Sequence, residues 1–160
     1  MTFKVFVSYS TQDMQQVSHL QQHLAGTPID VFVAEHSVAP SQDLSLTINH
    51  AIEHCDIFVL LWSYNAHTSP WVQQEIGKAT AWKKRILPLV LDHGAELPGF
   101  IQNLKYLSIH TDPSALNQAR EIIVSAYEEK MKRISDTAQA EKNNVALVAL
   151  GAFLLWAFNG

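Results

Sequence analysis

Short apolar runs alternate with longer amphipathic stretches along most of the chain. Residues 3–9, 29–33, 56–62 and 85–91 are rich in β-branched and aromatic side chains, which predicts four strands, and residues 105–109 predict a weaker fifth. Residues 56–62 are almost continuously apolar, as is typical of a strand buried on both faces of a parallel sheet. We therefore expect this third strand to lie at the centre of the sheet.

The stretches between the strands carry apolar residues three and four apart, which predicts helices. These are expected from the region of Ser10 to about residue 24, over 44–54, over 70–82 and over 113–133. Ser10 followed by Asp13 has the spacing of a helix N-cap with an acidic partner, and Ser69-Pro70 that of a cap followed by proline at the first helical position. Because parallel strands need helical crossovers, the alternation predicts a doubly wound α/β domain.

Proline and glycine positions refine this picture. Pro88 lies inside the fourth strand and places that part of it near a sheet edge or a bulge, because proline cannot donate to a neighbouring strand. The segment 92–103 contains Gly94, Pro98 and Gly99 and is expected to be a loop.

The last part of the chain has a different character. Residues 145–158 carry no polar side chain, so they do not match an ordinary surface helix. At about 1.5 Å per residue they span roughly 21 Å, against about 30 Å for a hydrocarbon core. The length alone is therefore ambiguous, and we expect a membrane tail. Because cations precede the segment and none follows it, such a tail holds the domain on the cytoplasmic side, at the inner membrane. Burial in an oligomer and the remnant of a longer chain are the alternatives. The predicted division is a domain over 1–134, a polar linker over 135–144 and a hydrophobic segment over 145–158.

Composition narrows the classes of function. The chain has 160 residues, enough for one domain with a full core, and a net charge of −4, which argues against a nucleic-acid partner bound through a basic face. Its single cysteine, Cys55, excludes an internal disulfide and a cysteine-based zinc site, and we interpret it as a core residue in a protein of a reducing compartment.

Several common chemistries lack their motifs. No G-x-G-x-x-G, Walker glycine loop or G-x-S-x-G elbow occurs, so the usual nucleotide cradles and a hydrolase serine are not predicted. His19 with His23, and His50 with His54, stand four apart on predicted helices, but neither pair has the glutamate of H-E-x-x-H. We interpret both pairs as helix faces and predict no metal.

Ligands of open parallel sheets bind beyond the carboxyl ends of the strands. Trp71 and Glu75 follow the third strand and share one face of the next predicted helix. An aromatic wall beside a carboxylate suits a cationic heterocycle. The alternative is a core tryptophan and an exposed glutamate favoured by the helix dipole.

The order and spacing of these segments resemble the Toll/interleukin-receptor (TIR) family over about residues 3–108. The matching segments are KVFVSYS with Asp13, VFVAE with Pro40, DIFVLL, SPWVQQE and ILPLV. The S-x-W-x-x-x-E spacing at 69–75 is the most specific part. The chain looks like the bacterial branch, which includes antiviral enzymes of the Thoeris type. The resemblance implies a flavodoxin-like sheet of order 2-1-3-4-5 and cleavage of the nicotinamide-ribose bond of NAD.

The resemblance also implies roles for individual residues. Glu75 matches the catalytic glutamate, with NAD as substrate and no separate cofactor. The expected substrate-binding residues are Tyr9, Ser10, Phe32, Glu35 and Trp71. Pro40-Ser41 stands where the family often has Pro-Gly, which makes a left-handed backbone less accessible in that loop.

Three functions follow as expectations. The first is an NAD-consuming enzyme of antiviral immunity that self-associates through its TIR surfaces; the others are a non-catalytic interaction module and a membrane-anchored, oligomerising effector. The enzyme requires Tyr9, Glu35 and Glu75 to meet near the carboxyl edge of the sheet, with Glu75 at an exposed pocket edge.

Overall fold

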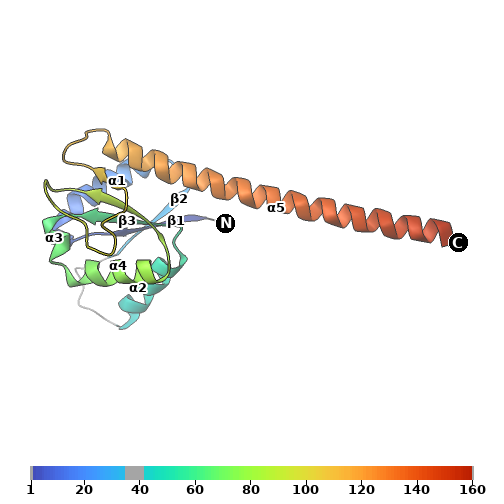
Figure 1. Cartoon of the computed structure of the whole chain (residues 1–160), viewed down its shortest axis with the longest axis horizontal. Coiled ribbons are helices and arrows are strands. Elements are labelled where there is room, and N and C mark those ends of the chain that lie inside the picture. Colours follow the sequence, from blue (N-terminus) through green and yellow to red (C-terminus); the bar gives the residue numbers. More distant parts are fainter. Residues whose placement is uncertain (1, 35–41, 160) are drawn as a thin grey trace. The chain divides into compact units, whose positions relative to one another are not determined.

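Five parallel strands form a single sheet in the order β2-β1-β3-β4-β5 (Figure 1). The structure, a computed structural model, describes residues 2–34 and 42–159. For residues 42, 43, 151 and 155–159 it describes the backbone alone. The strands are β1 (Phe3–Ser8), β2 (Ile29–Val33), β3 (Ile57–Trp62), β4 (Arg85–Val90) and β5 (Leu107–Ser108). The predicted doubly wound sheet and its strand order are confirmed.

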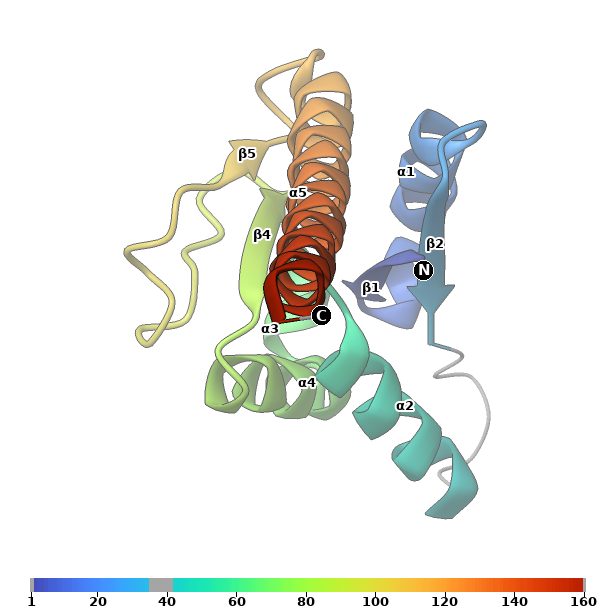
Figure 2. The same ribbon diagram turned by 90° about the vertical axis from the view of Figure 1, so that its right-hand side faces the viewer.

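Helices cover both faces of this sheet. Their bounds are η1 (Thr11–Asp13, a 3₁₀ turn), α1 (Met14–Leu24), α2 (Gln42–His54), α3 (Tyr64–His67), α4 (Pro70–Ala81) and α5 (Ala115–Asn159). The helices α2 and α4 lie on one face, whereas α1 and the first residues of α5 lie on the other (Figures 1 and 2). The short helix α3 was not predicted; Ser63 caps it by accepting a hydrogen bond from the Ala66 N–H.

The central strand is buried along its whole length, as its composition predicts. All six residues of β3 are buried, and β3 pairs with β1 on one side and β4 on the other. Pro88 of β4 lies opposite Leu60 of β3, and the pairing of β4 with β5 begins only at Leu89. At Pro88, strand β4 therefore has no β5 partner that would require a backbone N–H. This part of β4 lies at an edge of the sheet, as the proline predicts.

Alternation along the strands divides the core between the two faces. Phe6, Phe58 and Leu60 pack in the cluster that contains the buried residues of α2 and α4. The rings of Phe32, Phe6 and Phe58 form a row across three strands, with neighbouring centroids 5.5 and 5.3 Å apart. This face of the sheet is the one on which Glu75 lies.

The chain forms two compact units, Met1–Val124 and Ser125–Gly160. The sequence instead placed the end of the domain at residue 134. Residues 135–144, expected to be a polar linker, are helical and continue α5 without a break. Alanine, glutamate, lysine and glutamine are strong helix formers, so polarity alone does not end a helix there.

The prediction that residues 145–158 anchor the protein in a membrane is wrong. Among the described residues, no helix is long and apolar enough to cross a membrane. The physical reason is the length of the apolar stretch, roughly 21 Å of helix, which falls short of a hydrocarbon core. The predicted inner-membrane location depended on this tail and is wrong for the same reason, and the tail gives no support to a membrane-anchored effector.

Candidate active site

Glu75 lies beside the carboxyl end of β1, where it contacts Ser8. The Ser8 hydroxyl donates a hydrogen bond of 2.6 Å to Glu75 Oε2, a length typical of a hydroxyl bound to a carboxylate. The helix α4 brings Glu75 to this place because Ser69 caps its first turn through the Val72 N–H and Pro70 begins the helix. Ser8 lies inside the predicted strand 3–9, and no local pattern in the sequence identifies it as the partner of Glu75.

The glutamate is not exposed. Glu75 is 1% exposed and Ser8 is fully buried, so the expectation of a carboxylate at an exposed pocket edge is wrong. The spacing of Trp71 and Glu75 fixes the helix face on which they lie, but it does not say how closely that face is covered by the sheet. A carboxylate in such surroundings needs hydrogen-bond donors, since an unsatisfied buried charge is costly, and Ser8 is one of them.

Tyr9 and Ser10 follow Ser8 at the same edge of the sheet. Tyr9 is 1% exposed, and its hydroxyl donates a 2.7 Å hydrogen bond to the Ala34 carbonyl at the end of β2. Its ring therefore ties the ends of β1 and β2 together. Ser10 is 7% exposed and its side chain makes no capping bond; instead its carbonyl accepts from the Asp13 N–H in a tight turn. The predicted capping by Ser10 is wrong because a 3₁₀ turn precedes α1.

Asp13 has a different role from the one its spacing suggested. Its carboxylate accepts hydrogen bonds from the Ser63 hydroxyl at 2.5 Å and from the Asn65 side-chain amide at 3.0 Å. Asp13 thereby links the turn after β1 to the turn after β3, two strands that are neighbours in the sheet. No local sequence pattern predicts these long-range hydrogen bonds.

The remaining predicted residues lie less close together. Phe32 is half-buried and stacks on Phe6, so it belongs to the row of aromatic rings described above. Trp71 is half-buried in the first turn of α4, one turn before Glu75. Glu35, like Pro40 and Ser41, lies outside the described residues, so its expected meeting with Tyr9 and Glu75 stays a prediction. The structure thus places Tyr9, Ser10 and Glu75 around the end of β1.

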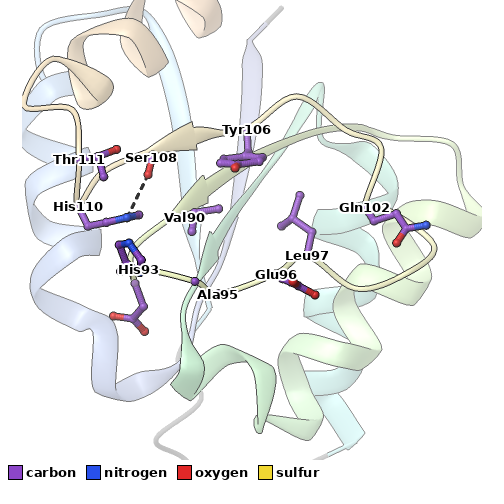
Figure 3. Close-up of a pocket in the computed structure, with 12 residues that line it drawn as sticks. Val90, His93, Ala95, Glu96, Leu97, Gln102, Tyr106, Ser108, His110 and Thr111 are labelled. Atoms are coloured by element: carbon purple, nitrogen blue, oxygen red, sulfur yellow. Dashed lines mark hydrogen bonds between the residues drawn. The ribbon is translucent and has the colours of Figure 1, made fainter.

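A cavity of about 660 Å³ lies at the carboxyl ends of β4 and β5 (Figure 3), and Glu75 is not among the residues that line it. The rings of His93 and His110 meet edge to face with centroids 5.5 Å apart, and Ser108 Oγ lies 3.0 Å from His110 Nδ1. Tyr106 forms another part of the wall (Figure 3). Of the predicted substrate-binding residues that the structure describes, Tyr9, Ser10, Phe32 and Trp71, none lines this cavity. We therefore place the candidate active site at the Ser8–Glu75 pair, because it contains a buried, hydrogen-bonded carboxylate. The size of the cavity does not decide the choice.

The histidine pairs and Cys55 offer no second reactive centre. His23 Nδ1 and His54 Nδ1 each bond the carbonyl four residues earlier, and the rings of His50 and His54 stack at 4.1 Å. In the described part of the chain, no group of three or more His, Cys, Asp or Glu side chains is arranged so that it could hold a metal ion. Burial raises the pKa of the Cys55 thiol from 9.0 to about 11, which keeps it protonated near neutral pH.

Comparison with solved structures supports the fold. The TIR domain of the Toll-related receptor TRR-2 from Hydra magnipapillata matches with a TM-score of 0.65 at 20% identity, over 79% of this chain and 99% of that one. The CMP N-glycosidase BcmB from Clostridium botulinum matches with 0.56 at 20%, over 72% and 96%. A 2-desoxiribosyltransferase from Leishmania mexicana matches with 0.54 at 10%, over 74% and 97%.

Comparison of the sequence alone places the chain in a family. No curated protein matches it. The profile of the TIR domain, however, matches residues 5–123, which include most of β1, the whole of the other four strands and the helix that carries Glu75. The chain therefore belongs to the TIR domain family.

Proposed function

We propose that this TIR domain cleaves the nicotinamide-ribose bond of NAD, with Glu75 as the catalytic residue. In this proposal the reaction serves prokaryotic antiviral defence, either by depleting NAD or by producing a signal derived from ADP-ribose. The observation that carries the proposal is the buried hydrogen bond between Ser8 and Glu75 at the carboxyl end of β1. That edge of an open parallel sheet is where ligands bind.

The chemistry needs only one carboxylate. An O-glycosidase requires a general acid to protonate its leaving oxygen, whereas nicotinamide leaves as a neutral molecule from a pyridinium ring that is already cationic. Water then adds to the ribose carbon, and the products are nicotinamide, ADP-ribose and a proton. The glutamate contributes by holding the ribose and by stabilising the positive charge that develops on it in the transition state.

The neighbours of Glu75 fit this role. Ser8 fixes one carboxylate oxygen and so sets the orientation of the group. Trp71 is one turn away on α4 and provides an aromatic surface for a cationic ring. Because Glu75 is 1% exposed, the proposal requires that the groups covering it move when NAD binds.

The fold itself is compatible with chemistry at an N-glycosidic bond. One neighbour in fold is named as a CMP N-glycosidase, and the bond broken in NAD is likewise N-glycosidic. At 20% identity this likeness concerns the fold, so Glu75 must be tested on this chain.

A specific observation favours a second candidate, a TIR module that binds partners without catalysis. Glu75 and Tyr9 are both 1% exposed, as residues with a purely structural role would be. In that case the Ser8–Glu75 bond fixes α4 against the sheet and nothing more.

One experiment separates the two candidates. The purified full chain is incubated with NAD at low and at high protein concentration, and released nicotinamide is measured for the wild type, Glu75→Gln and Glu53→Gln. Glu53 is a matched control because it is exposed on α2. The enzyme proposal expects release by the wild type and Glu53→Gln and loss in Glu75→Gln. If the wild type releases no nicotinamide at either concentration, the enzyme proposal is wrong and the non-catalytic binding module takes its place.

A further inference from the structure

A regular seam of positions follows α5 through the second unit. Residues alternately three and four apart share one side of this helix and define the α5 seam: Met131, Ile134, Ala138, Glu141, Val145, Val148 and Ala152. All are apolar except Glu141. Over 131–138 these positions are apolar at the 3.5-residue spacing of a coiled coil. Over 145–158 every position is apolar, so the seam continues there in the same register.

The chain itself leaves this seam uncovered. Ile134 is 39% exposed, Val145 is 70% exposed and Val148 is 73% exposed. A helix in water owes most of its stability to packing of an apolar face, and single helices are only marginally stable. The second unit, Ser125–Gly160, is formed by α5, so it has no other helix or strand of its own to cover this face.

We propose that the α5 seam packs against the same seam of a second copy of this chain, parallel and in register, as a coiled coil. A second copy carries the same repeat, so apolar residues meet at every level of the seam except that of Glu141. This contact is distinct from any association through the first unit, and it does not depend on the proposed enzymatic activity.

The charge at Glu141 selects the parallel arrangement. In heptad terms Glu141 occupies a d position and Lys142 the adjacent e position. In a parallel, in-register pair, Glu141 faces Glu141 of the second copy. Residues at e flank this d layer, so the Lys142 side chains of both copies lie beside the two carboxylates and offset their repulsion. An antiparallel pair sets d positions against a positions, so Glu141 would face an apolar residue such as Val145, and a buried carboxylate without a paired cation is costly.

The first test measures the mass of the full chain in solution at rising concentration. The wild type is expected to associate to at least twice the 17.9 kDa of one chain. The double variant V145E/V148E, with both changes in the seam, is expected to stay at the monomer mass over the same range. The double variant L147E/L150E adds the same charge off the seam, at residues 67% and 58% exposed, and is expected to associate like the wild type.

Two results of this measurement would overturn the proposal. A wild type that remains monomeric would show that the seam has no partner in a second copy. Loss of association in both double variants would show contact through apolar character in general rather than through the seam.

The second test reads register and direction by disulfide formation. Cys55 is buried and its thiol pKa is raised to about 11, so it is not expected to form a cross-link. Any disulfide-linked dimer is therefore expected to arise from the single introduced cysteine. V148C is expected to form a disulfide-linked dimer at least about tenfold faster than L150C, because positions in the seam bring paired Cβ atoms within bonding range and residue 150 lies off it. Equal rates in the two variants, or no cross-link in V148C, would contradict a parallel, in-register seam.

Discussion

At the scale of single residues, the central feature is a carboxylate buried against a serine hydroxyl. Ser8 donates to Glu75 at 2.6 Å, and both residues are buried. A hydrogen bond to a charged group contributes about 1.5 to 3 kcal/mol, and removing the donor leaves the carboxylate to bear its desolvation cost. Ser8 therefore acts through Glu75 as a positioning residue.

Replacing Ser8 with alanine should lower the free energy of unfolding by about 1.5 to 3 kcal/mol, because Glu75 loses this donor. Urea denaturation followed by circular dichroism measures the change. Ser18→Ala is the control, since Ser18 only bonds the Met14 carbonyl within α1 and its loss should cost less than about 0.5 kcal/mol. If the two substitutions lower the free energy of unfolding equally, the Ser8–Glu75 hydrogen bond contributes no more to stability than the Ser18 bond within α1.

The Cys55 thiol should report folding through its protonation. Desolvation by burial raises its pKa from 9.0 to about 11, with Lys84 opposing the shift. A raised pKa means that this stabilising contribution is complete below pH 9 and is lost as the pH rises toward 11. Thiol labelling at a pH of about 8, below both values, should be slow in the folded protein and fast in denaturant. Rapid labelling of the folded protein would contradict the buried environment.

At this scale the sequence predicts position better than environment. The spacing from Ser69 to Glu75 correctly set the glutamate in the second turn of a helix after the third strand. Its burial and its bond to Ser8 depend on how closely α4 packs on β1, 67 residues away in sequence, and no local pattern carries that information. The same holds for Asp13, whose partners lie 50 and 52 residues further along the chain.

At the scale of elements, the sequence determines where α4, the helix with the candidate catalytic residue, begins. Ser69 accepts a hydrogen bond from the Val72 N–H, and Pro70 occupies the first turn. Both features satisfy needs of a helix N-terminus. They place Trp71 and Glu75 in the first two turns of α4.

Ser69→Ala should therefore cost about 1 kcal/mol of stability through loss of the cap. Ser69→Asp should recover most of it, because aspartate also caps and its charge suits the helix N-terminus. The midpoint of chemical denaturation distinguishes the two variants. A Ser69→Asp variant as unstable as Ser69→Ala would mean that the serine contributes by packing instead.

Element boundaries show where the sequence pattern reaches its limit. The strands and α4 were predicted to within a few residues because apolar periodicity and turn residues both mark them. The weak fifth strand shrinks to Leu107–Ser108, and the last helix extends from Ala115 to Asn159. Residues 135–144 are polar, which predicts a linker, but they are also strong helix formers, and in the structure they continue the helix.

At the scale of the whole molecule, the contribution of α5 to the core of the first unit comes from its first turns. Ala115, Ala119 and Ile123 are at most 1% exposed, whereas the side chains described from residue 132 onward are exposed. The core of the first unit therefore does not use the apolar end of the chain.

A chain that ends at Lys142 should consequently fold and unfold cooperatively, with a Tm within about 4 °C of the full chain for a domain of this size. Thermal unfolding followed by circular dichroism measures this. The truncation also removes the part of the α5 seam beyond Glu141, so the shortened chain should be less associated. Loss of the cooperative transition would show that residues beyond 142 belong to the core.

The central claim is that Glu75 cleaves NAD, and the most direct measurement is the rate of nicotinamide release by Glu75→Gln relative to the wild type. Glutamine keeps an acceptor for the Ser8 hydroxyl and removes a buried charge, so the variant should remain folded. Loss of one electrostatic contact in the transition state is worth roughly 3 to 4 kcal/mol, so the rate should fall about a hundred-fold or more. A folded Glu75→Gln protein that releases nicotinamide at the wild-type rate would contradict the claim.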